Sequence, residues 1–322
     1  MVLITGAAGF IGSALAAYLN KEGYTDLVLC DDFSRPEKRL NWITKKYRFL
    51  VERVHLFEWL GAHKRDVQVI FHIGARTDTT LTDEDTFSRL NTAYSQQLWR
   101  LAVEADIPFF YASSAATYGD GRWGFSDDEQ HLHRLEPLNP YAKSKHAFDL
   151  WVMTQSEQPS RWAGFKFFNV YGPNEYHKGP MASVVWHGYN QIKSEGKMRL
   201  FRSHRPDYAD GEQKRDFIYV KDVVKVLEHF SRERMPSGIY NLGTGQARTF
   251  LDLAGALFEA MGRAKRIEFI DTPAAIRQAY QYFTQAEMRK LREAGYTQPF
   301  FSLEEGIADY VQNYLLPEVR IW

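Results

Sequence analysis

A tyrosine and a lysine stand four residues apart in the stretch Asn-Pro-Tyr-Ala-Lys-Ser-Lys at 139–145. Asn is a favoured helix N-cap and Pro fits the first helical position, so we predict that a helix starts here. Tyr141 and Lys145 would then share one helix face, where the ammonium group favours the phenolate and lowers the pKa of the tyrosine. Such a tyrosine can transfer protons near neutral pH. The spacing also suits a solvated helix face, so the choice depends on whether the chain supplies a cofactor and a substrate site.

Three glycines near the start of the chain have the spacing G-x-x-G-x-x-G, at Gly6, Gly9 and Gly12. A short apolar run precedes them, a helical pattern follows, and a second apolar run at 27–30 ends at Asp31. Glycine permits a tight turn and a close approach of the backbone to a pyrophosphate at a helix N-terminus. The order of strand, glycine turn, helix, strand and acid therefore predicts a dinucleotide-binding unit rather than a purely structural turn.

The residues around the acid give conflicting signals about the cofactor. Asp31 would hold the hydroxyl groups of the adenosine ribose, which favours NAD. Arg35, Lys38 and Arg39 follow at once and could contact a 2′-phosphate, which favours NADP, unless they form a solvated basic loop. This stretch alone leaves the choice between NAD and NADP open.

Hydroxyl side chains follow another apolar run, at 108–112. Ser113, Ser114 and Thr117 would lie at the C-terminal end of a strand, where open α/β sheets place their sites. A serine hydroxyl there can hydrogen-bond a reacting alcohol or carbonyl, although Ser and Thr are also common in turns. The tyrosine and lysine downstream favour the functional interpretation.

The composition limits the class of protein. The 322 residues carry 40 basic and 40 acidic side chains, and this balance disfavours electrostatic binding to nucleic acid or to a membrane surface. The sequence has no apolar run long enough for a membrane span, and its first apolar run is too short for a signal peptide. The single cysteine, Cys30, fits a reducing compartment, and no metal-ligand spacing occurs. We therefore expect a cytoplasmic protein without a metal site.

The glycine spacing, together with the Tyr-x-x-x-Lys pair downstream, resembles the extended branch of the short-chain dehydrogenase/reductase superfamily. The resemblance implies an α/β fold, with a doubly wound parallel Rossmann sheet and a smaller α/β substrate-binding domain. We expect residues 1–171, with 214–245 returning to them, to form the NADP-binding domain. Residues 172–213 and 246–322 are expected to form the substrate-binding domain.

Later motifs narrow the resemblance to the ADP-glycero-manno-heptose 6-epimerases, which make a nucleotide-heptose for the lipopolysaccharide core. The likeness covers nearly the whole chain and implies an ADP-heptose substrate. It also implies NADP as cofactor, with NAD as the alternative. The motifs are Tyr-Ala-Ser-Ser-Ala-Ala-Thr-Tyr-Gly at 111–119, Phe-Asn-Val-Tyr-Gly-Pro at 168–173, His-Lys-Gly at 177–179, Met-Ala-Ser at 181–183 and Lys-Arg-Asp-Phe-Ile-Tyr-Val at 214–220.

The resemblance also implies a role for each matching residue. Tyr141 and Lys178 would be the two acid/base residues, with Lys145 and Ser114 supporting Tyr141. The implied substrate contacts are Ser114, Thr117, Asn169, His187, Phe201, Arg202, Ser203, His204, Arg215 and Tyr280. The implied cofactor contacts are Gly6, Gly9, Phe10, Ile11, Gly12, Asp31, Asp32, Lys38, Arg53, Ile73, Gly74, Ala75, Arg76, Thr77, Asn91, Lys145, Val170 and Lys178.

The implied reaction oxidises C6″ of the heptose to an aldehyde, which rotates and receives the hydride on its other face. Because the two epimeric hydroxyl groups point in different directions, two acid/base residues are chemically sensible. We also expect a homo-oligomer. Three departures from the family bear on the site: Pro180 replaces a small hydroxyl residue, Asp32 replaces an Asn, and the loop 202–213 is longer.

Two alternatives remain open. One is another nucleotide-sugar enzyme, such as a UDP-hexose 4-epimerase or a dehydratase, and the other is a regulator that binds NADP without turnover. A 4-epimerase leaves Lys178 unexplained, and a dehydratase would need an Asp-Glu pair that residues 114–117 lack. Non-catalytic relatives commonly lose the Tyr or the Lys, and Tyr141 and Lys145 are both present.

Overall fold

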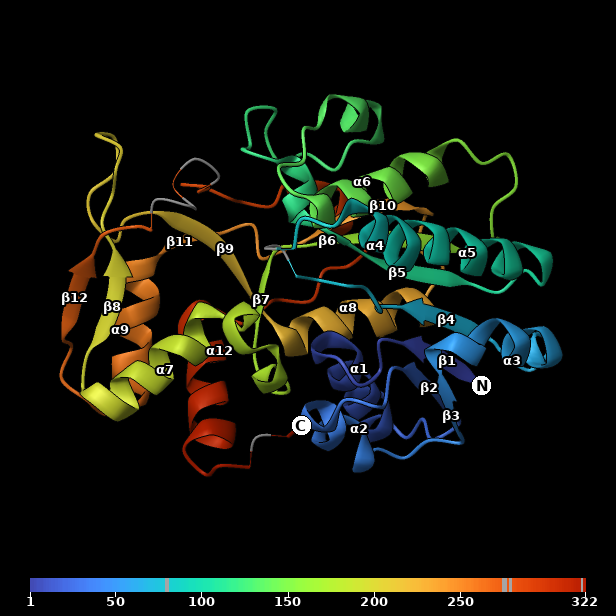
Figure 1. The fold of residues 1–322 in the computed structure, drawn as a ribbon, viewed down its shortest axis with the longest axis horizontal. Helices are drawn as coiled ribbons and strands as arrows, with labels where there is room; N and C mark the ends of the chain where they lie inside the picture. Colours follow the sequence, from blue (N-terminus) through green and yellow to red (C-terminus); the bar gives the residue numbers. More distant parts are fainter. Residues whose placement is uncertain (79–80, 274–276, 278–279, 320) are drawn as a thin grey trace.

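The computed structural model describes residues 1–78, 81–273, 277, 280–319 and 321–322, and its largest element is a seven-stranded parallel sheet (Figure 1). The strand order is β10-β6-β5-β4-β1-β2-β3, and every neighbouring pair is parallel. The direction of winding reverses between β1 and β4, which opens a crevice at the carboxyl ends of the strands. The strands are β1 (Val2–Thr5), β2 (Leu27–Asp31), β3 (Phe49–Glu52), β4 (Val69–His72), β5 (Phe109–Ser114), β6 (Trp162–Phe167) and β10 (Gly238–Leu242).

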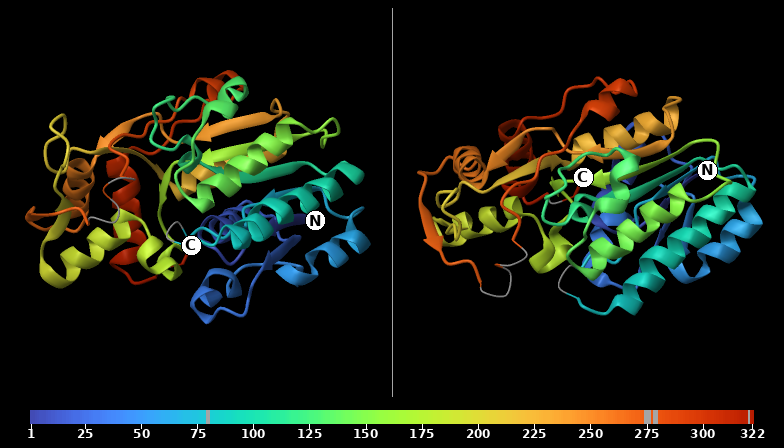
Figure 2. Two further views of the ribbon diagram at one scale, coloured as in Figure 1. Left: turned by 45° about the horizontal axis from the view of Figure 1, so that its top comes forward. Right: turned by 90° about the horizontal axis from the view of Figure 1, so that it is seen from above.

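Helices cover both faces of this sheet, as Figure 2 shows, and its central strands are therefore nearly continuous runs of buried residues. α1 packs against α8 on one face, and α5 and α6 lie on the other. The predicted helix start is confirmed, because Asn139 caps α6 by accepting a hydrogen bond from the backbone N–H of Ala142 at 2.9 Å. The helices here are α1 (Phe10–Lys21), α2 (Arg39–Ile43), α3 (Leu56–His63), α4 (Glu84–Phe87), α5 (Tyr94–Glu104), α6 (Pro140–Met153) and α8 (Val220–Arg232).

The other strands form two small sheets at one end of the molecule (Figure 1). β9 lies between β7, which is parallel to it, and β11, which is antiparallel, while β8 pairs in parallel with β12. The segment 214–245 thus supplies β9 to a small sheet and β10 to the edge of the large one. The elements are β7 (Asn169–Tyr171), β8 (Met198–Phe201), β9 (Lys214–Tyr219), β11 (Ala247–Thr249), β12 (Ile267–Ile270), α7 (Val184–Glu195), α9 (Phe250–Ala260), α11 (Arg289–Glu293) and α12 (Leu303–Tyr310).

The predicted fold class is confirmed: an α/β protein with a parallel Rossmann sheet and a smaller α/β part. Short 3₁₀ turns complete the site region, notably Ala115–Tyr118 after β5 and Tyr176–Met181 after β7. Among the described residues, every helix is too short or too polar to cross a bilayer.

Candidate active site

The glycine turn between β1 and α1 packs so tightly that side chains are excluded from it. Gly6 has a φ of +70°, and a Cβ atom there would lie 2.6 Å from the backbone of Gly74. A Cβ atom on Gly12 would lie 2.2 Å from the carbonyl oxygen of Gly6. Gly9 precedes α1 and brings no side chain to cap it, so the first N–H groups of the helix stay available. This cradle fits the pyrophosphate of a dinucleotide.

A cavity of about 390 Å³ opens above this turn, at the carboxyl ends of β1, β2 and β4. It is lined by most of the residues that the sequence assigned to the cofactor, the exceptions being Asn91, Lys145 and Val170. Sequence reasoning missed several other lining residues; Thr5, Cys30 and His72 lie in the carboxyl-terminal ends of strands, a position that could have identified them. The expected lining residues are Gly6, Gly9, Phe10, Ile11, Gly12, Asp31, Asp32, Lys38, Arg53, Ile73, Gly74, Ala75, Arg76, Thr77 and Lys178. Arg35, which the sequence analysis named as a possible 2′-phosphate contact, also lines the cavity. The missed residues are Thr5, Cys30, His72, Asp78, Leu90, Tyr94, His177 and Met181.

Asp31 holds the ribose end of the cavity through both carboxylate oxygens. One accepts a hydrogen bond from the backbone N–H of Ala8 at 2.9 Å, and the other accepts from Asp32 N–H at 2.7 Å. Lys38 Nζ also lies 3.1 Å from this second oxygen and forms an ion pair with it. Arg53 lines the same cavity. The acid that favours NAD is therefore partly neutralised by Lys38, one of the basic residues that would favour NADP.

Asn91 joins the cofactor cavity to the helix that carries Tyr141. Its amide accepts from the N–H of Arg76 at 2.8 Å and donates to the C=O of Arg76 at 3.0 Å. The same amide donates to Ser144 Oγ at 2.9 Å, and this hydroxyl donates to the C=O of Tyr141 at 2.7 Å. Asn91 is buried and holds the loop after β4 against α6, so it acts on the cavity through the backbone of that loop.

The pKa of Tyr141 differs from the sequence-based expectation. Burial raises it, and a hydrogen bond with the Ser114 side chain opposes that effect. Lys145 does not supply the expected lowering: it is not among the groups that shift the pKa of Tyr141, and its Nζ donates to the C=O of Ala112 at 2.7 Å. Burial lowers the pKa of Lys145 itself to about 8. The structure thus brings Tyr141, Ser114 and Lys145 together as predicted, and corrects the direction of the shift at Tyr141.

Lys178 enters the cavity from the 3₁₀ turn that follows β7. Its ammonium group lies 5.6 Å from the centre of the Phe10 ring at the start of α1. Burial lowers the pKa of Lys178, and the carboxylate of Glu175 opposes this. Glu175 is held in turn by Gly172 N–H at 3.2 Å and Ser183 Oγ–H at 2.8 Å. A half-buried lysine with a lowered pKa is a suitable proton acceptor.

The residues expected to bind the substrate fall into two groups. Tyr280 packs edge-to-face on Phe201 at 6.1 Å, and the Arg215 guanidinium lies 5.3 Å from the Tyr280 ring centre. Arg215 is buried and donates to the C=O groups of Lys214 and Gln281, so it is fixed in place, and burial lowers its pKa. The two aromatic rings and the guanidinium group thus form one continuous surface, which we call the wall.

The remaining substrate candidates are tied into the loop 202–213 or lie nearer to Lys178. Arg202 forms an ion pair with Asp210 at 3.3 Å, whose carboxylate also accepts from Ser203 N–H at 2.8 Å. His204 N–H donates to Tyr282 Oη at 2.9 Å. His187 Nε2 lies 3.3 Å from the C=O of Pro180, Asn169 Oδ1 accepts from Thr284 Oγ1 at 3.5 Å, and Thr117 is buried after β5. Val170, expected at the cofactor, follows Asn169 in β7. The charge of Arg202 is thus paired with an acid of the same loop.

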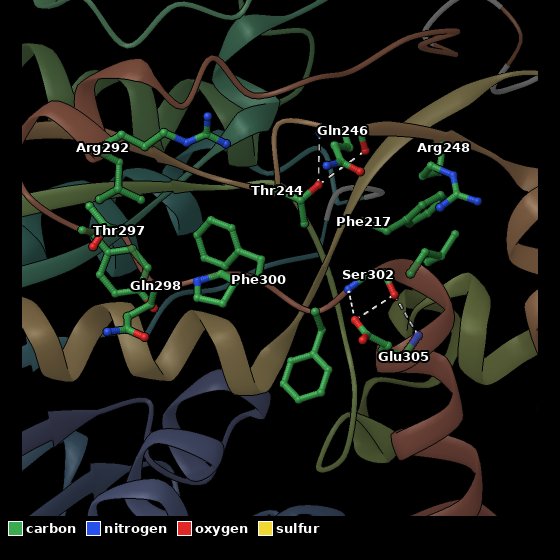
Figure 3. Close-up of a pocket in the computed structure, with 15 residues that line it drawn as sticks. Phe217, Thr244, Gln246, Arg248, Arg292, Thr297, Gln298, Phe300, Ser302 and Glu305 are labelled. Carbon is green, nitrogen blue, oxygen red and sulfur yellow. Dashed lines mark hydrogen bonds between the residues drawn. The ribbon is translucent and has the colours of Figure 1, made fainter.

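A second cavity, of about 450 Å³, lies between β9, the turn before β11 and the residues 291–305 (Figure 3). None of the residues assigned to the site from the sequence lines it. Arg248 is paired with Glu304 at 2.6 Å, and Ser302 and Glu305 bind each other in a capping box at the start of α12. Because these polar groups already have partners, we take the cofactor cavity and not this one as the active site.

Comparisons with known proteins give matches over nearly the whole chain. The model of the NAD dependent epimerase/dehydratase family matches residues 2–243. The ADP-L-glycero-D-manno-heptose-6-epimerase of Fusobacterium nucleatum is 45% identical over 328 residues, 99% of each chain. The enzyme of the same name from Nitratidesulfovibrio vulgaris is 48% identical over 317 residues, 98% of each chain. The crystal structure of the Helicobacter pylori ADP-L-glycero-D-manno-heptose-6-epimerase has a TM-score of 0.81 and 27% identity, covering 97% of this chain and 95% of that one.

We predict that Gly12→Ala weakens dinucleotide binding by at least about tenfold, because the new methyl group displaces the turn that contacts the pyrophosphate. Calorimetric titration with NADP and NAD measures the effect. Gly61→Ala is the matched control, since Gly61 lies in α3 with open space around its Cβ position. The control should bind normally and be slightly more stable. Equal binding by both variants would contradict the assignment of the cradle.

We predict that Asn91→Ala destabilises the fold by about 2 kcal/mol, because the N–H and C=O of Arg76 lose their partner and Ser144 Oγ loses a donor in a buried place. Cofactor affinity should fall as well, since the loop after β4 loses its attachment to α6. Thermal unfolding and cofactor titration measure the two effects. Asn190→Ala is the control, because that amide bonds only to the C=O of Trp186 within α7. A normal affinity in Asn91→Ala would refute the coupling.

Proposed function

This chain belongs to the NAD dependent epimerase/dehydratase family, and we propose that it is an ADP-L-glycero-D-manno-heptose-6-epimerase. It interconverts the D-glycero and L-glycero forms of ADP-β-D-manno-heptose, a precursor of the lipopolysaccharide core. The observation that carries this conclusion is the identity of 45% and 48% to two enzymes of that name, over both parts of the fold. The position of Lys178 in the lining of the cofactor cavity supports this proposal, because the reaction needs a second acid/base group.

The enzyme uses a nicotinamide dinucleotide, and we propose that this is NADP. The glycine cradle and the uncapped start of α1 fit the pyrophosphate, and Asp31 lies at the cavity end where the ribose would bind. Asn91 does not line the cavity and supports it through the loop after β4. Lys38 and Arg53 supply positive charge for a 2′-phosphate at the ribose end. The ion pair between Lys38 and Asp31 lowers the repulsion that the carboxylate would otherwise exert on that phosphate.

The proposed chemistry assigns a proton transfer to each of two residues. A dinucleotide held by the glycine cradle would supply the hydride chemistry, that is, reversible oxidation at C6″ of the heptose. Tyr141, hydrogen-bonded by Ser114, exchanges the proton of the hydroxyl group in one epimer. Lys178 does so for the other epimer, because burial favours its neutral amine, which can accept a proton. Lys145, one helical turn after Tyr141 on α6, adds positive charge at the end of β5, where its Nζ donates to the C=O of Ala112.

We propose that the ADP part of the substrate lies against the wall formed by Phe201, Arg215 and Tyr280, with residues 202–204 at its edge. Asn169, His187 and Thr117 would contact the heptose. The division into a cofactor domain (1–171 with 214–245) and a substrate domain (172–213 and 246–322) is part of this proposal. We further propose that the enzyme works in the cytoplasm as a homo-oligomer, and the buried single thiol of Cys30 fits a reducing compartment.

We predict that Tyr141→Phe and Lys178→Met each reduce turnover by at least about 100-fold, because each removes one proton-transfer group. Epimerisation of ADP-D-glycero-β-D-manno-heptose followed by NMR measures turnover, and the content of bound cofactor should stay normal in both variants. Absence of conversion by the wild-type enzyme would overturn the proposed function. Wild-type rates in either variant would overturn only the two-base assignment.

We predict that Lys38→Ala and Arg53→Ala each weaken NADP binding by about tenfold or more, because each removes a charge-assisted contact to the 2′-phosphate. Binding of NAD should be unchanged or tighter, because Lys38→Ala also frees Asp31 for the ribose. Titration of both dinucleotides gives the ratio of affinities. Lys64→Ala, on the surface pair with Glu104, is the control. An equal loss for NAD and NADP would count against a 2′-phosphate contact.

A further inference from the structure

A buried ion pair lies behind the catalytic helix, between Asp149 of α6 and Lys166 of β6. The Lys166 Nζ–Asp149 Oδ2 distance is 2.6 Å, and both side chains are 0% exposed. Removing two charges from water is costly, and a hydrophobic pair in the same place is often at least as stable. Stability alone therefore does not account for this pair, and neither residue entered the site that we assigned from the sequence.

The lysine of the pair directs the hydroxyl group of Thr117. Lys166 Nζ donates to Thr117 Oγ1 at 2.7 Å, and Thr117 Oγ1 donates its own hydrogen to the C=O of Ser114 at 2.8 Å. Because an ammonium group can only donate, the Thr117 hydroxyl must accept on that side and is left with one orientation. Lys166 also lies 5.3 Å from the centre of the Tyr118 ring. The 3₁₀ turn that carries Thr117 is thus fixed relative to Ser114.

The carboxylate of the pair attaches β5 to α6. Asp149 Oδ2 accepts from Ser113 Oγ at 2.7 Å, and Asp149 Oδ1 accepts from Tyr111 Oη at 3.0 Å. Asp149 stands four residues after Lys145, one helical turn along α6. Lys145 in turn donates to the C=O of Ala112, the residue between Tyr111 and Ser113. Two successive turns of the catalytic helix are therefore bound to consecutive residues of β5.

We propose that Asp149 and Lys166 are positioning residues of the epimerase, whose ion pair locks Ser114 and Thr117 at the end of β5 onto the helix that carries Tyr141 and Lys145. This inference rests on the proposed function for its link to turnover. Its geometric content is that the hydroxyl groups and the two helix residues move as one unit. The pair touches neither the substrate nor the cofactor cavity and acts only through these neighbours.

The charge of Asp149 reaches both helix residues. It raises the pKa of Lys145, opposing burial, and it also raises the pKa of Tyr141. Lys145 therefore keeps more of its ammonium form near neutral pH than burial alone would allow. The titratable and charged groups that face this centre are Tyr111 of β5, Tyr118 of the 3₁₀ turn, Lys166 of β6, His72 of β4, and Tyr141, Lys145 and His146 of α6.

Asp149→Asn tests the effect of the carboxylate charge on Tyr141 and Lys145, and Lys166→Met tests the positioning of Thr117. Asp149→Asn keeps an acceptor for Tyr111 but removes the charge, so the pKa values of Tyr141 and Lys145 both fall. Both limbs of the pH profile of kcat/KM should move to lower pH, since Tyr141 and Lys145 titrate as neighbours in the site and the pKa of each falls. Lys166→Met should lower kcat about 10- to 100-fold by releasing Thr117, with little change in KM. Lys166→Arg should restore part of this loss.

The matched control is the half-buried pair of Asp309 and Lys221, which likewise includes a tyrosine hydroxyl but lies between α8 and α12. Asp309 Oδ2 accepts from Lys221 Nζ at 2.5 Å and from Tyr219 Oη at 2.6 Å. Asp309→Asn should reduce thermal stability and leave kcat and the pH profile unchanged. If Asp149→Asn and Lys166→Met behave in the same way, the pair is merely structural and the proposal is overturned.

Two further measurements keep the outcome decisive. If Asp149→Asn fails to fold, the double variant Asp149→Asn/Lys166→Met replaces it, because it leaves no buried charge unpaired, and it must show the same movement of the pH profile. Titration of the Lys145 side chain by NMR of labelled lysine needs no substrate. A lower Lys145 pKa in the Asp149 variant supports the proposal even if the wild type fails to epimerise ADP-heptose, and an unchanged pKa overturns it.

Discussion

The parallel direction of all seven strands is the constraint on which the site depends. It places every carboxyl end on one edge of the sheet, so that β1, β2 and β4 meet the cofactor there while β5 delivers Ser114 to the same edge. Helices are then required on both faces, and α6 brings Tyr141 alongside β5. The backbones of Gly6 and Gly74 approach so closely at this edge that only glycine is tolerated. The cofactor cavity and the proposed catalytic groups therefore lie together at the edge formed by the carboxyl ends of the strands.

Two lysines of the site, Lys145 and Lys178, lose water around their charge, and an acid opposes the effect on the pKa at both. Lys145 and Lys178 are both withdrawn from water, which lowers the pKa of each. An acid opposes the effect in each case: Asp149 one turn along the helix, and Glu175 three residues before Lys178. Each acid is itself held by hydroxyl donors. In each case the acid limits how far burial shifts the lysine toward its neutral amine.

The sequence was sufficient for the features that depend on local geometry. The spacing of Gly6, Gly9 and Gly12 and the cap at Asn139 gave the cofactor cradle and the start of α6, because turn and cap chemistry act over a few residues. The direction of the pKa shift at Tyr141 could not be predicted in this way. It depends on burial and on where the Lys145 ammonium points, and both are set by strands distant in sequence. The ion pair of Asp149 and Lys166 could not be predicted either, because it depends on how β6 packs against α6.

The position of Lys178 shows how a shared fold is made specific for one reaction. Two buried amides fix the loop that carries it. Asn41 donates to the C=O of Ala8 in the glycine turn at 3.1 Å and to the C=O of Asn174 at 3.0 Å. Asn174 has a φ of +77°, a conformation that costs energy in a residue other than glycine, and its amide donates to Ser13 of α1 at 3.1 Å. The backbone that leads to Lys178 is therefore anchored to the same turn and helix that form the pyrophosphate cradle. Lys178, the proposed second acid/base group, is therefore placed relative to the cofactor cavity, and not merely relative to the part of the chain that follows it.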